Sequence, residues 1–431
     1  MNDDVKTAPV EGGGEGPVAA RERVGDLDAL RGFALIGVFI ANIAGYAGAG
    51  FMATEDQLAA LPTAGVDAVA DFFVQWLVHD KANTLFAFLF GLGFWLQMQR
   101  LTARGADFAR IYLRRLTILL LFGLFHCFFV FSYDILHLYA LAGFALFFLR
   151  GVSDKALLLA GLALALFGRL AVTEAIEFSG YAAISGVDAA YTDAAVMARQ
   201  AASESGDYLA LLRLFTEFLR LDWIQNGLLL AWFFYALGRF MVGAFVGRRG
   251  WLENAERHMS GFRRWLRLLL PAGLVGELVA SLMHTGIDLG VIPESVALSV
   301  AAEALHLVAA PTLAAGYLCA IVVGLRSPLA ARLIRPLAFV GRMALTNYVT
   351  QSLIIAFVLF GVWPGLALAG KIGTFAVLLV VAAGYGAQVA FSAFWLKRFA
   401  YGPLEWIWRA LTYGTLPRLR LAKGKPAPAA L

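Results

Sequence analysis

The chain has 431 residues, of which 60% are hydrophobic and 15% are charged, and its mean hydropathy is +0.73. A soluble protein is about half apolar and about a quarter charged, so this composition excludes an ordinary soluble domain. The net charge of +5 does not indicate a nucleic-acid-binding protein, because the cationic residues are concentrated between long apolar runs.

The N-terminal segment is polar and rich in glycine, proline and alanine. It lacks a basic start followed by an apolar core, so no cleaved signal peptide is expected. We predict that residues 1–24 form a disordered cytoplasmic tail. Residues 25–400 are predicted to form a transmembrane helical domain, and residues 401–431 a cytoplasmic C-terminal tail.

Long apolar runs recur along the rest of the chain, each near the ~20 residues that a helix needs to cross a bilayer. Only helices and closed barrels satisfy their backbone hydrogen bonds in lipid, and these runs lack the alternation of barrel strands. The predicted fold class is therefore all-α, a polytopic membrane protein with about ten transmembrane helices. The predicted helices cover residues 30–51, 84–98, 113–131, 135–149, 156–178, 223–246, 266–284, 298–325, 343–362 and 372–396.

The distribution of lysine and arginine predicts the orientation of these helices. With the N-terminus inside, 28 of the 35 cationic residues fall in inner segments and only five in outer segments. Inner segments of membrane proteins carry an excess of Lys and Arg. We therefore predict that both termini are cytoplasmic.

Histidines gather toward the predicted outer side of this topology. Five of the six fall in an outer half-helix or an outer loop, and acidic residues accompany them: His79, His126, His137, His284 and His306, with Asp134, Glu277 and Glu303. Ionisable groups in lipid are costly and mark functional hypotheses. A histidine in a shared pocket could act as a general base, whereas interfacial placement and interhelical hydrogen bonding are the alternative.

The predicted inner face is mainly arginine. Arg31, Arg114 and Arg115 could bind a phosphate-bearing donor, or could serve only topology and lipid headgroup contact. Asn42 shares a face of the first helix with Arg31. Other polar residues that could line a substrate pocket, or could serve as bonds between helices, are Lys81, His137, Glu303, His306, Asn347 and Gln351.

Three further features concern ligands, assembly and transport. Glu303 and His306 have ligand-like spacing, but a second such pair is missing, so no metal site and no permanently bound cofactor is expected. The spacing of Gly243 and Gly247 permits close helix packing and suggests a homodimer. The break at Gly91 and Gly93 in the second predicted helix is a hint of a discontinuous transport helix.

Several motifs occur in a familiar order. They read DALRGFALIG at 28–37, LFAFLFGLGF at 85–94, GLFH at 123–126, DILHLYA at 134–140, GRMALTNY at 341–348 and YGPLEW at 401–406. In this order they closely resemble the YeiB family of bacterial inner-membrane proteins, whose C-terminal half is catalogued as a domain of unknown function. The resemblance covers nearly the whole chain after the N-terminal segment.

That family is in turn similar to heparan-α-glucosaminide N-acetyltransferase and other transmembrane acyltransferases. The resemblance implies transfer of an acyl group from a cytoplasmic thioester, with acyl-CoA as co-substrate, to an envelope sugar, lipid or small molecule outside. Asn42 matches the asparagine of the N-acetyltransferase, but residues 43–78 contain no histidine to match its external one. His126 or His79 would then act as base and Asp134 would orient it. The alternative function is a transporter or flippase without covalent chemistry.

Overall fold

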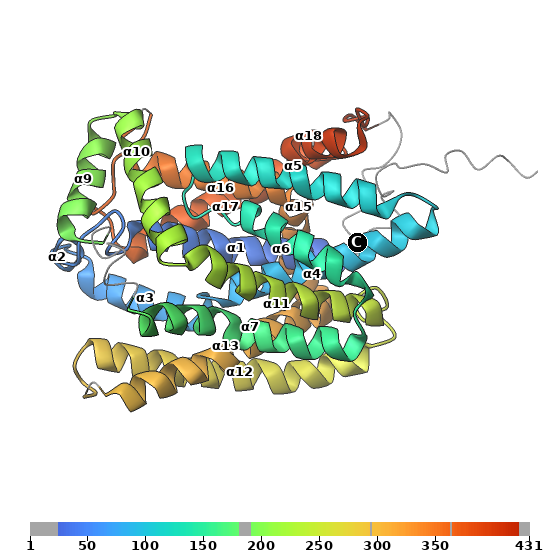
Figure 1. The fold of residues 1–431 in the computed structure, drawn as a ribbon, viewed down its shortest axis with the longest axis horizontal. Helices are drawn as coiled ribbons and strands as arrows, with labels where there is room; N and C mark the ends of the chain where they lie inside the picture. Colours follow the sequence, from blue (N-terminus) through green and yellow to red (C-terminus); the bar gives the residue numbers. More distant parts are fainter. Residues whose placement is uncertain (1–24, 181–190, 294, 363, 422–431) are drawn as a thin grey trace, which may run out of the picture.

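The computed structural model describes residues 25–180, 191–293, 295–362 and 364–421. Within these ranges the chain is helical, and its long helices run nearly parallel to the long axis of the molecule (Figure 1). The predicted disordered tail at residues 1–24 lies outside the described residues. The prediction of an all-α polytopic membrane protein is confirmed.

All ten predicted segments coincide with helices. Their bounds are α1 Gly25–Ala47, α4 Lys81–Ala103, α5 Phe108–Phe129, α6 Leu136–Phe148, α7 Asp154–Phe178, α11 Leu228–Arg249, α12 Met259–Asp288, α13 Val296–Gly324, α16 Ala344–Leu359 and α17 Thr374–Leu396. Of the described helices, seven are long and apolar enough to cross a membrane: α1, α5, α7, α11, α12, α13 and α17. The apolar helices α6 and α16 are shorter. α4 is continuous over 23 residues, so the glycine pair in it does not break the helix.

Shorter helices connect the long ones. We call the end of the bundle that carries the predicted cytoplasmic loops the inner end, and the opposite end the outer end. The helices α2 (Glu55–Ala59), α9 (Asp193–Glu204) and α10 (Tyr208–Leu219) lie together at the outer end, at the left of Figure 1. The remaining connections are α3 (Ala64–Leu77), the 3-10 turn η2 (Leu149–Gly151), the π-helical turn η4 (Arg220–Gln225), α14 (Pro328–Ile334) and α15 (Leu337–Arg342).

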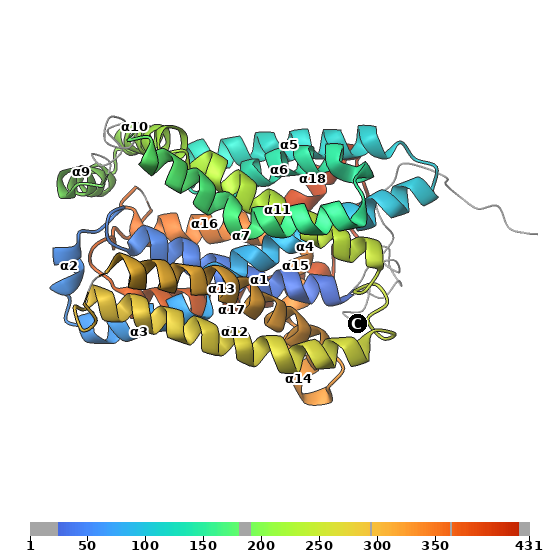
Figure 2. The same cartoon turned by 60° about the horizontal axis from the view of Figure 1, so that its bottom comes forward.

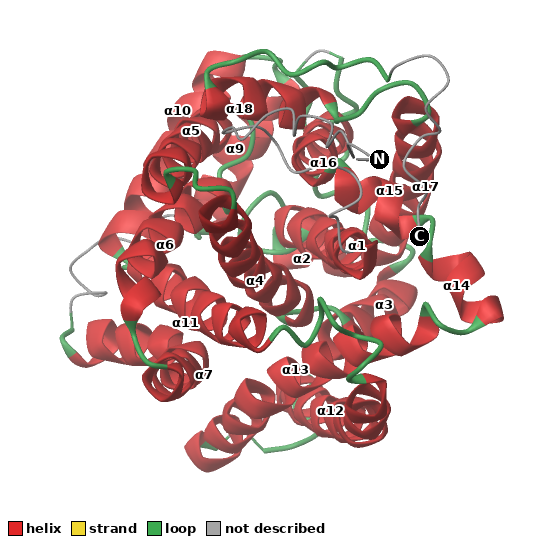
Figure 3. Cartoon of the chain, turned by 90° about the vertical axis from the view of Figure 1, so that its right-hand side faces the viewer, coloured by secondary structure: helices red, strands yellow, loops and turns green. Residues whose placement is uncertain are grey.

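The C-terminal segment is more than a tail. Its helix α18, Pro403–Tyr413, begins with proline at its first turn and ends at Gly414, which has a φ of 70°. A glycine in the left-handed region is a common helix stop. Viewed from the inner end, α18 lies beside α5 (Figure 3), and the two helices are in contact. Part of the predicted tail, residues 401–431, therefore packs against the membrane domain.

The centre of the bundle is α1, which is surrounded by the other long helices in Figure 3. Two glycines bring it against α15. A Cβ on Gly32 would lie 2.0 Å from the carbonyl oxygen of Leu337, and one on Gly341 would lie 1.8 Å from that of Asp28. These distances are far below van der Waals contact, so only glycine allows the backbones to approach so closely.

The glycine pair of α11 also serves contacts within the chain. A Cβ on Gly243 would lie 2.1 Å from the carbonyl oxygen of Phe88, and one on Gly247 would meet Trp95 at 3.0 Å. Both neighbours belong to α4. The surface that suggested a homodimer from sequence is therefore occupied by the packing of α11 on α4.

Candidate functional site

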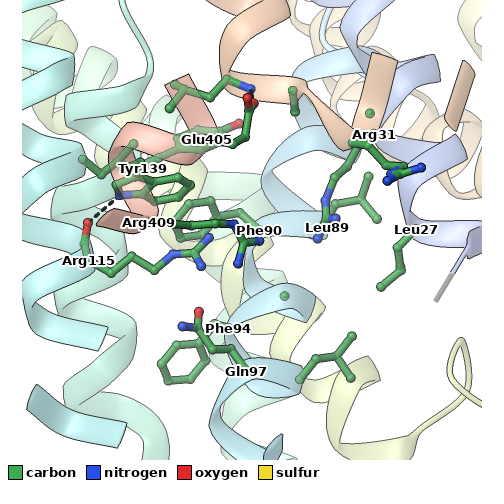
Figure 4. A pocket seen from close by; sticks show the side chains of 18 of the residues that line it. Leu27, Arg31, Leu89, Phe90, Phe94, Gln97, Arg115, Tyr139, Glu405 and Arg409 are labelled. Atoms are coloured by element: carbon green, nitrogen blue, oxygen red, sulfur yellow. Dashed lines mark hydrogen bonds between the residues drawn. The ribbon is translucent and has the colours of Figure 1, made fainter. Parts of the chain in front are cut away.

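A cavity of about 280 Å³ opens among the helices at the inner end, and we name it the arginine pocket (Figure 4). Its walls come from α1, α4, α5, α6, α15, α16 and α18. Five arginines line it, namely Arg31, Arg100, Arg115, Arg342 and Arg409, together with the aromatic residues Phe86, Phe90, Phe94, Tyr112, Tyr139, Tyr348, Tyr401, Trp408 and Tyr413. Its lining therefore combines cationic and aromatic groups.

Arginines outnumber acidic residues in the lining of this pocket. Asp28 and Glu405 are the acidic residues of the lining, and both are engaged in structural contacts. Asp28 accepts a hydrogen bond from Arg31 at 3.1 Å. Glu405 is buried and accepts hydrogen bonds from the first turn of α16. A lining rich in guanidinium groups favours the binding of an anion.

Arg115 is held in place by α18. Its guanidinium lies 4.0 Å from the centre of the Trp408 ring, and the Trp408 indole N–H donates to the Arg115 carbonyl oxygen at 3.1 Å (Figure 4). No carboxylate lies within ion-pair distance of Arg115 in the described part of the chain. A planar cation stacked on an aromatic ring keeps its N–H groups available for a phosphate or carboxylate.

Glu405 joins two motifs that are far apart in the sequence. Its carboxylate accepts hydrogen bonds from the backbone N–H groups of Leu345 at 2.7 Å and Thr346 at 3.0 Å, and from the Thr346 hydroxyl at 2.6 Å. Burial raises the pKa of Glu405 above its ordinary value, although these hydrogen bonds act in the opposite direction. The GRMALTNY and YGPLEW segments are thus connected by a helix cap beside the pocket.

A buried histidine–aspartate group lies next to the deep end of the pocket. Asp134 is fully buried between two histidines. One of its oxygens lies 2.8 Å from His126 Nδ1, and the other lies 2.9 Å from His137 Nδ1. Both imidazoles can donate from Nδ1 while neutral, which leaves Nε2 as an acceptor. His126 Nε2 is buried and has no hydrogen-bond partner among the described residues.

Tyr348 separates this group from the arginine pocket. Its ring lines the pocket, and its hydroxyl donates to Asp134 at 3.4 Å and accepts from the Ile135 backbone N–H at 3.3 Å. The ring centres of Tyr348 and His126 are 5.3 Å apart. From the other side, the Trp223 ring of η4 covers His137 at 5.1 Å.

A second buried group, which we name the Asp80 cluster, consists of Asp80, Lys81, Glu277 and His306. His306 Nδ1 lies 3.1 Å from a Glu277 oxygen, and its Nε2 lies 3.2 Å from Asp80 Oδ2. The Lys81 ammonium donates to Glu277 and to the Gln75 carbonyl oxygen. No hydrogen bond or ion pair among the described residues joins this cluster to Asp134. Four of the five outer histidines therefore fall into two separate groups, and His284 belongs to neither.

Other predicted site residues lie outside the arginine pocket. Arg114 is exposed on the outside of α5, unlike its neighbour Arg115. Asn347 donates to Val340 and Ser392, so it bonds α16 to α15 and α17. The other placements follow: Gln351 bonds to Leu35 and Gln388, Glu303 lies 3.9 Å from Arg169, and the His79 ring centre lies 6.3 Å from that of His306.

Asn42 is half-buried on α1, and its side-chain amide makes no hydrogen bond within the described part of the chain. Residues that the sequence alone did not single out include Tyr348, Arg342, Arg409 and Trp408. Two of them, Arg342 and Tyr348, belong to the GRMALTNY motif, and that motif could have identified them as candidates. Arg409 lies one helical turn after Glu405, so both face the pocket, but this could not be inferred before the position of α18 was known.

The C-terminal part of the chain matches a known protein family. The family described as "Protein of unknown function (DUF418)" matches residues 246–415, which include α18 and the arginine and tyrosine of the GRMALTNY motif. No solved structure matches the chain.

Two curated bacterial proteins are similar to almost the whole chain. "Uncharacterized protein YxaH" of Bacillus subtilis (strain 168) is 30% identical over 413 residues, covering 92% of this chain and 96% of its own length. "Uncharacterized protein YeiB" of Escherichia coli (strain K12) is 30% identical over 401 residues, covering 91% of this chain and 96% of its own. The chain therefore belongs to the YeiB family of membrane proteins.

Proposed function

We propose that this protein is a membrane-embedded acyltransferase, which moves an acyl group from a cytoplasmic thioester to a hydroxyl or amine acceptor on the far side of a bacterial inner membrane. One observation carries the proposal. The arginine pocket ends at Tyr348, whose hydroxyl contacts the carboxylate that orients His126. An anion-binding cavity and a candidate general base thus lie on opposite sides of one side chain.

The pocket suits the phosphate-bearing part of an acyl-CoA donor. Arg31, Arg115 and Arg409 would contact the phosphates, and the aromatic walls would pack against the thioester arm. A volume of about 280 Å³ is small for a ligand pocket, since these typically measure ~300–1,000 Å³. It would hold the thioester arm and a phosphate group, with the nucleotide at the inner surface.

The His126–Asp134 pair has the arrangement of a general base. Asp134 holds Nδ1, so the Nε2 lone pair of His126 would accept the proton of the acceptor hydroxyl or amine. The acceptor oxygen or nitrogen would then bond to the thioester carbonyl carbon. On collapse of the tetrahedral intermediate, the carbon–sulfur bond would break and His126 would return the proton to the leaving thiolate. Asn42 is proposed to hydrogen-bond the acyl oxygen.

The donor site is tested by binding of labelled acetyl-CoA to the purified full-length protein. Arg115→Gln should weaken binding by about 10–100-fold, because charge-assisted hydrogen bonds contribute ~1.5–3 kcal/mol. Arg114→Gln is the matched control, since it removes the same charge one residue away on the exposed side of α5. Equal effects of the two substitutions, or no binding at all, would contradict the donor site.

The chemistry is tested in inverted membrane vesicles that contain the protein, whose cytoplasmic face is outside and receives labelled acetyl-CoA. We expect the label to enter lipid or sugar extracts with the wild type and not with His126→Gln, while donor binding is retained. Release of free label without any acylated product would show that the base acts on water. Substrate movement across the membrane without any donor would instead favour a transporter.

A further inference from the structure

The Asp80 cluster has a proton requirement that follows from its geometry. His306 Nδ1 faces Glu277 at 3.1 Å, and its Nε2 faces Asp80 at 3.2 Å. A neutral imidazole has one N–H and one lone pair, so it can donate to only one of two carboxylates. The other nitrogen would then direct its lone pair at a carboxylate oxygen. One additional proton, on His306 or on one of the carboxyls, removes this conflict.

The charges of the four cluster residues agree with this count. Lys81 pairs with Glu277, so a protonated His306 leaves the four buried groups of the cluster electrically neutral. Without that proton, one buried carboxylate has no balancing charge inside the cluster, and such an imbalance is costly.

Several charged or titratable groups from neighbouring elements face this cluster. Arg169 of α7 lies 3.5 Å from Asp80 and also near Glu303 of α13. Arg239 of α11 donates to Thr84, whose hydroxyl is 3.1 Å from that of Tyr235. His79 and Tyr317 complete the set: the His79 ring stands near His306, and the Tyr317 hydroxyl donates to the Leu77 carbonyl oxygen. Arg169 and Arg239 add positive charge around Asp80, and Glu303 adds negative charge. The requirement for one proton therefore follows from the two carboxylate contacts of His306 and not from the charges of the wider surroundings.

The backbone at Asp80 has an unusual conformation. Asp80 precedes α4 with a φ of 61°, in the left-handed region that non-glycine residues rarely adopt. Such strain persists only where surrounding contacts enforce it, and it is common at functional sites. Asp80 is fixed by His306, by Arg169 and by the Tyr235 hydroxyl that donates to its carbonyl oxygen.

The helices that carry the other two members lie at the edge of the bundle. In Figure 2, α12 runs beside α3 and α13, and Figure 3 places the α12–α13 pair at the periphery. Both contain an internal proline, Pro271 in α12 and Pro311 in α13. A proline removes a backbone hydrogen bond and locally weakens a helix. Arg169, which pairs with Asp80, and its neighbour Glu303 are partly exposed, so they lie between the buried cluster and the molecular surface.

We propose that His306, Asp80 and Glu277 form a proton-binding site within the membrane domain, separate from the arginine pocket and independent of acyl transfer. The bound proton is shared between the imidazole and its two carboxylate neighbours. It holds α13 against α4 and α12, and its release leaves like charges facing each other across a neutral ring. The ligand of this site is a single exchangeable proton.

The test uses the full-length protein with nitrogen-15-labelled histidine and needs no acyl donor. At pH 8 we expect the His306 signal, assigned by its loss in His306→Gln, to be that of an imidazolium. Glu277→Gln should convert His306 to the neutral form, because an amide can donate to one ring nitrogen. His284→Gln is the control, since that residue lies on α12 and outside the cluster.

Infrared spectra distinguish the position of the proton. A neutral His306 together with a carboxylic acid band that disappears in Glu277→Gln or Asp80→Asn also supports the site, with the proton on a carboxyl. Asparagine is the suitable replacement because it tolerates the left-handed backbone. The proposal is overturned if the wild type has a neutral His306 and no such band. It is equally overturned if His306 is an imidazolium in the wild type and neither variant changes its protonation.

Discussion

The contact between α5 and α6 gives the sharpest prediction. A Cβ on Gly123 would lie 2.2 Å from the backbone nitrogen of His137, whereas ordinary contact begins near 3.4 Å. In Gly123→Ala the two helices must separate by about 1.2 Å, and such overpacking costs ~1–3 kcal/mol. The same movement would lengthen the 2.8 Å bond between His126 and Asp134 to about 4 Å, beyond hydrogen-bond range.

Two measurements on the purified protein test this prediction. The thermal midpoint of the monodisperse fraction reports the loss of packing, and histidine nitrogen spectra report whether His126 keeps its proton on Nδ1. The control is Gly386→Ala, because nothing lies within 4 Å of a Cβ there. Alanine at that position should be neutral or stabilising by up to ~1 kcal/mol. If Gly123→Ala had the midpoint of the control and an unchanged His126 spectrum, the proposed steric reasoning would be refuted.

Three further substitutions address the cluster, the helix contacts and the cap. Glu277→Ala should cost about 3–5 kcal/mol because it leaves Lys81 buried without a counter-ion, and adding Lys81→Met should recover most of that loss in a denaturation assay. Gly243→Ala should lower the thermal midpoint while light scattering gives an unchanged particle mass. A change in mass would contradict the packing of that glycine within the chain. Glu405→Ala should destabilise by ~1–3 kcal/mol in the same denaturation assay, and Glu405→Gln by less, since an amide oxygen still accepts from the first turn of α16. Equal losses in the two variants would argue against the cap.

The geometry of the two histidine groups suggests different chemistry for each. At Asp134, one carboxylate accepts from two imidazoles, so each ring can remain neutral with a free lone pair. In the Asp80 cluster, one imidazole lies between two carboxylates and needs a second proton. The first arrangement suits a base, and the second suits the storage of a proton. Glu303 and His306 are three residues apart on one helix, but the hydrogen-bond partners of His306 are Asp80 and Glu277, which come from other parts of the chain.

Sequence alone determined the class of the protein and the positions of its long helices. This was possible because a helix in lipid must satisfy its own backbone, so ten apolar runs are ten local signals. The same reasoning identified Arg31, Arg115, His126 and Asp134 as candidates, since charged groups in apolar segments are costly.

Only the tertiary structure decided which of these residues meet. Three contacts join segments that are 60, 293 and 214 residues apart in the sequence. They are the cap formed by Glu405 on α16, the stacking of Arg115 on Trp408 and the contact of Tyr348 with Asp134. Helix periodicity fixes the face on which a side chain lies, but not the helix opposite to it. That choice depends on the close approaches that glycines permit and on how buried polar groups find partners, and both are properties of the packed bundle.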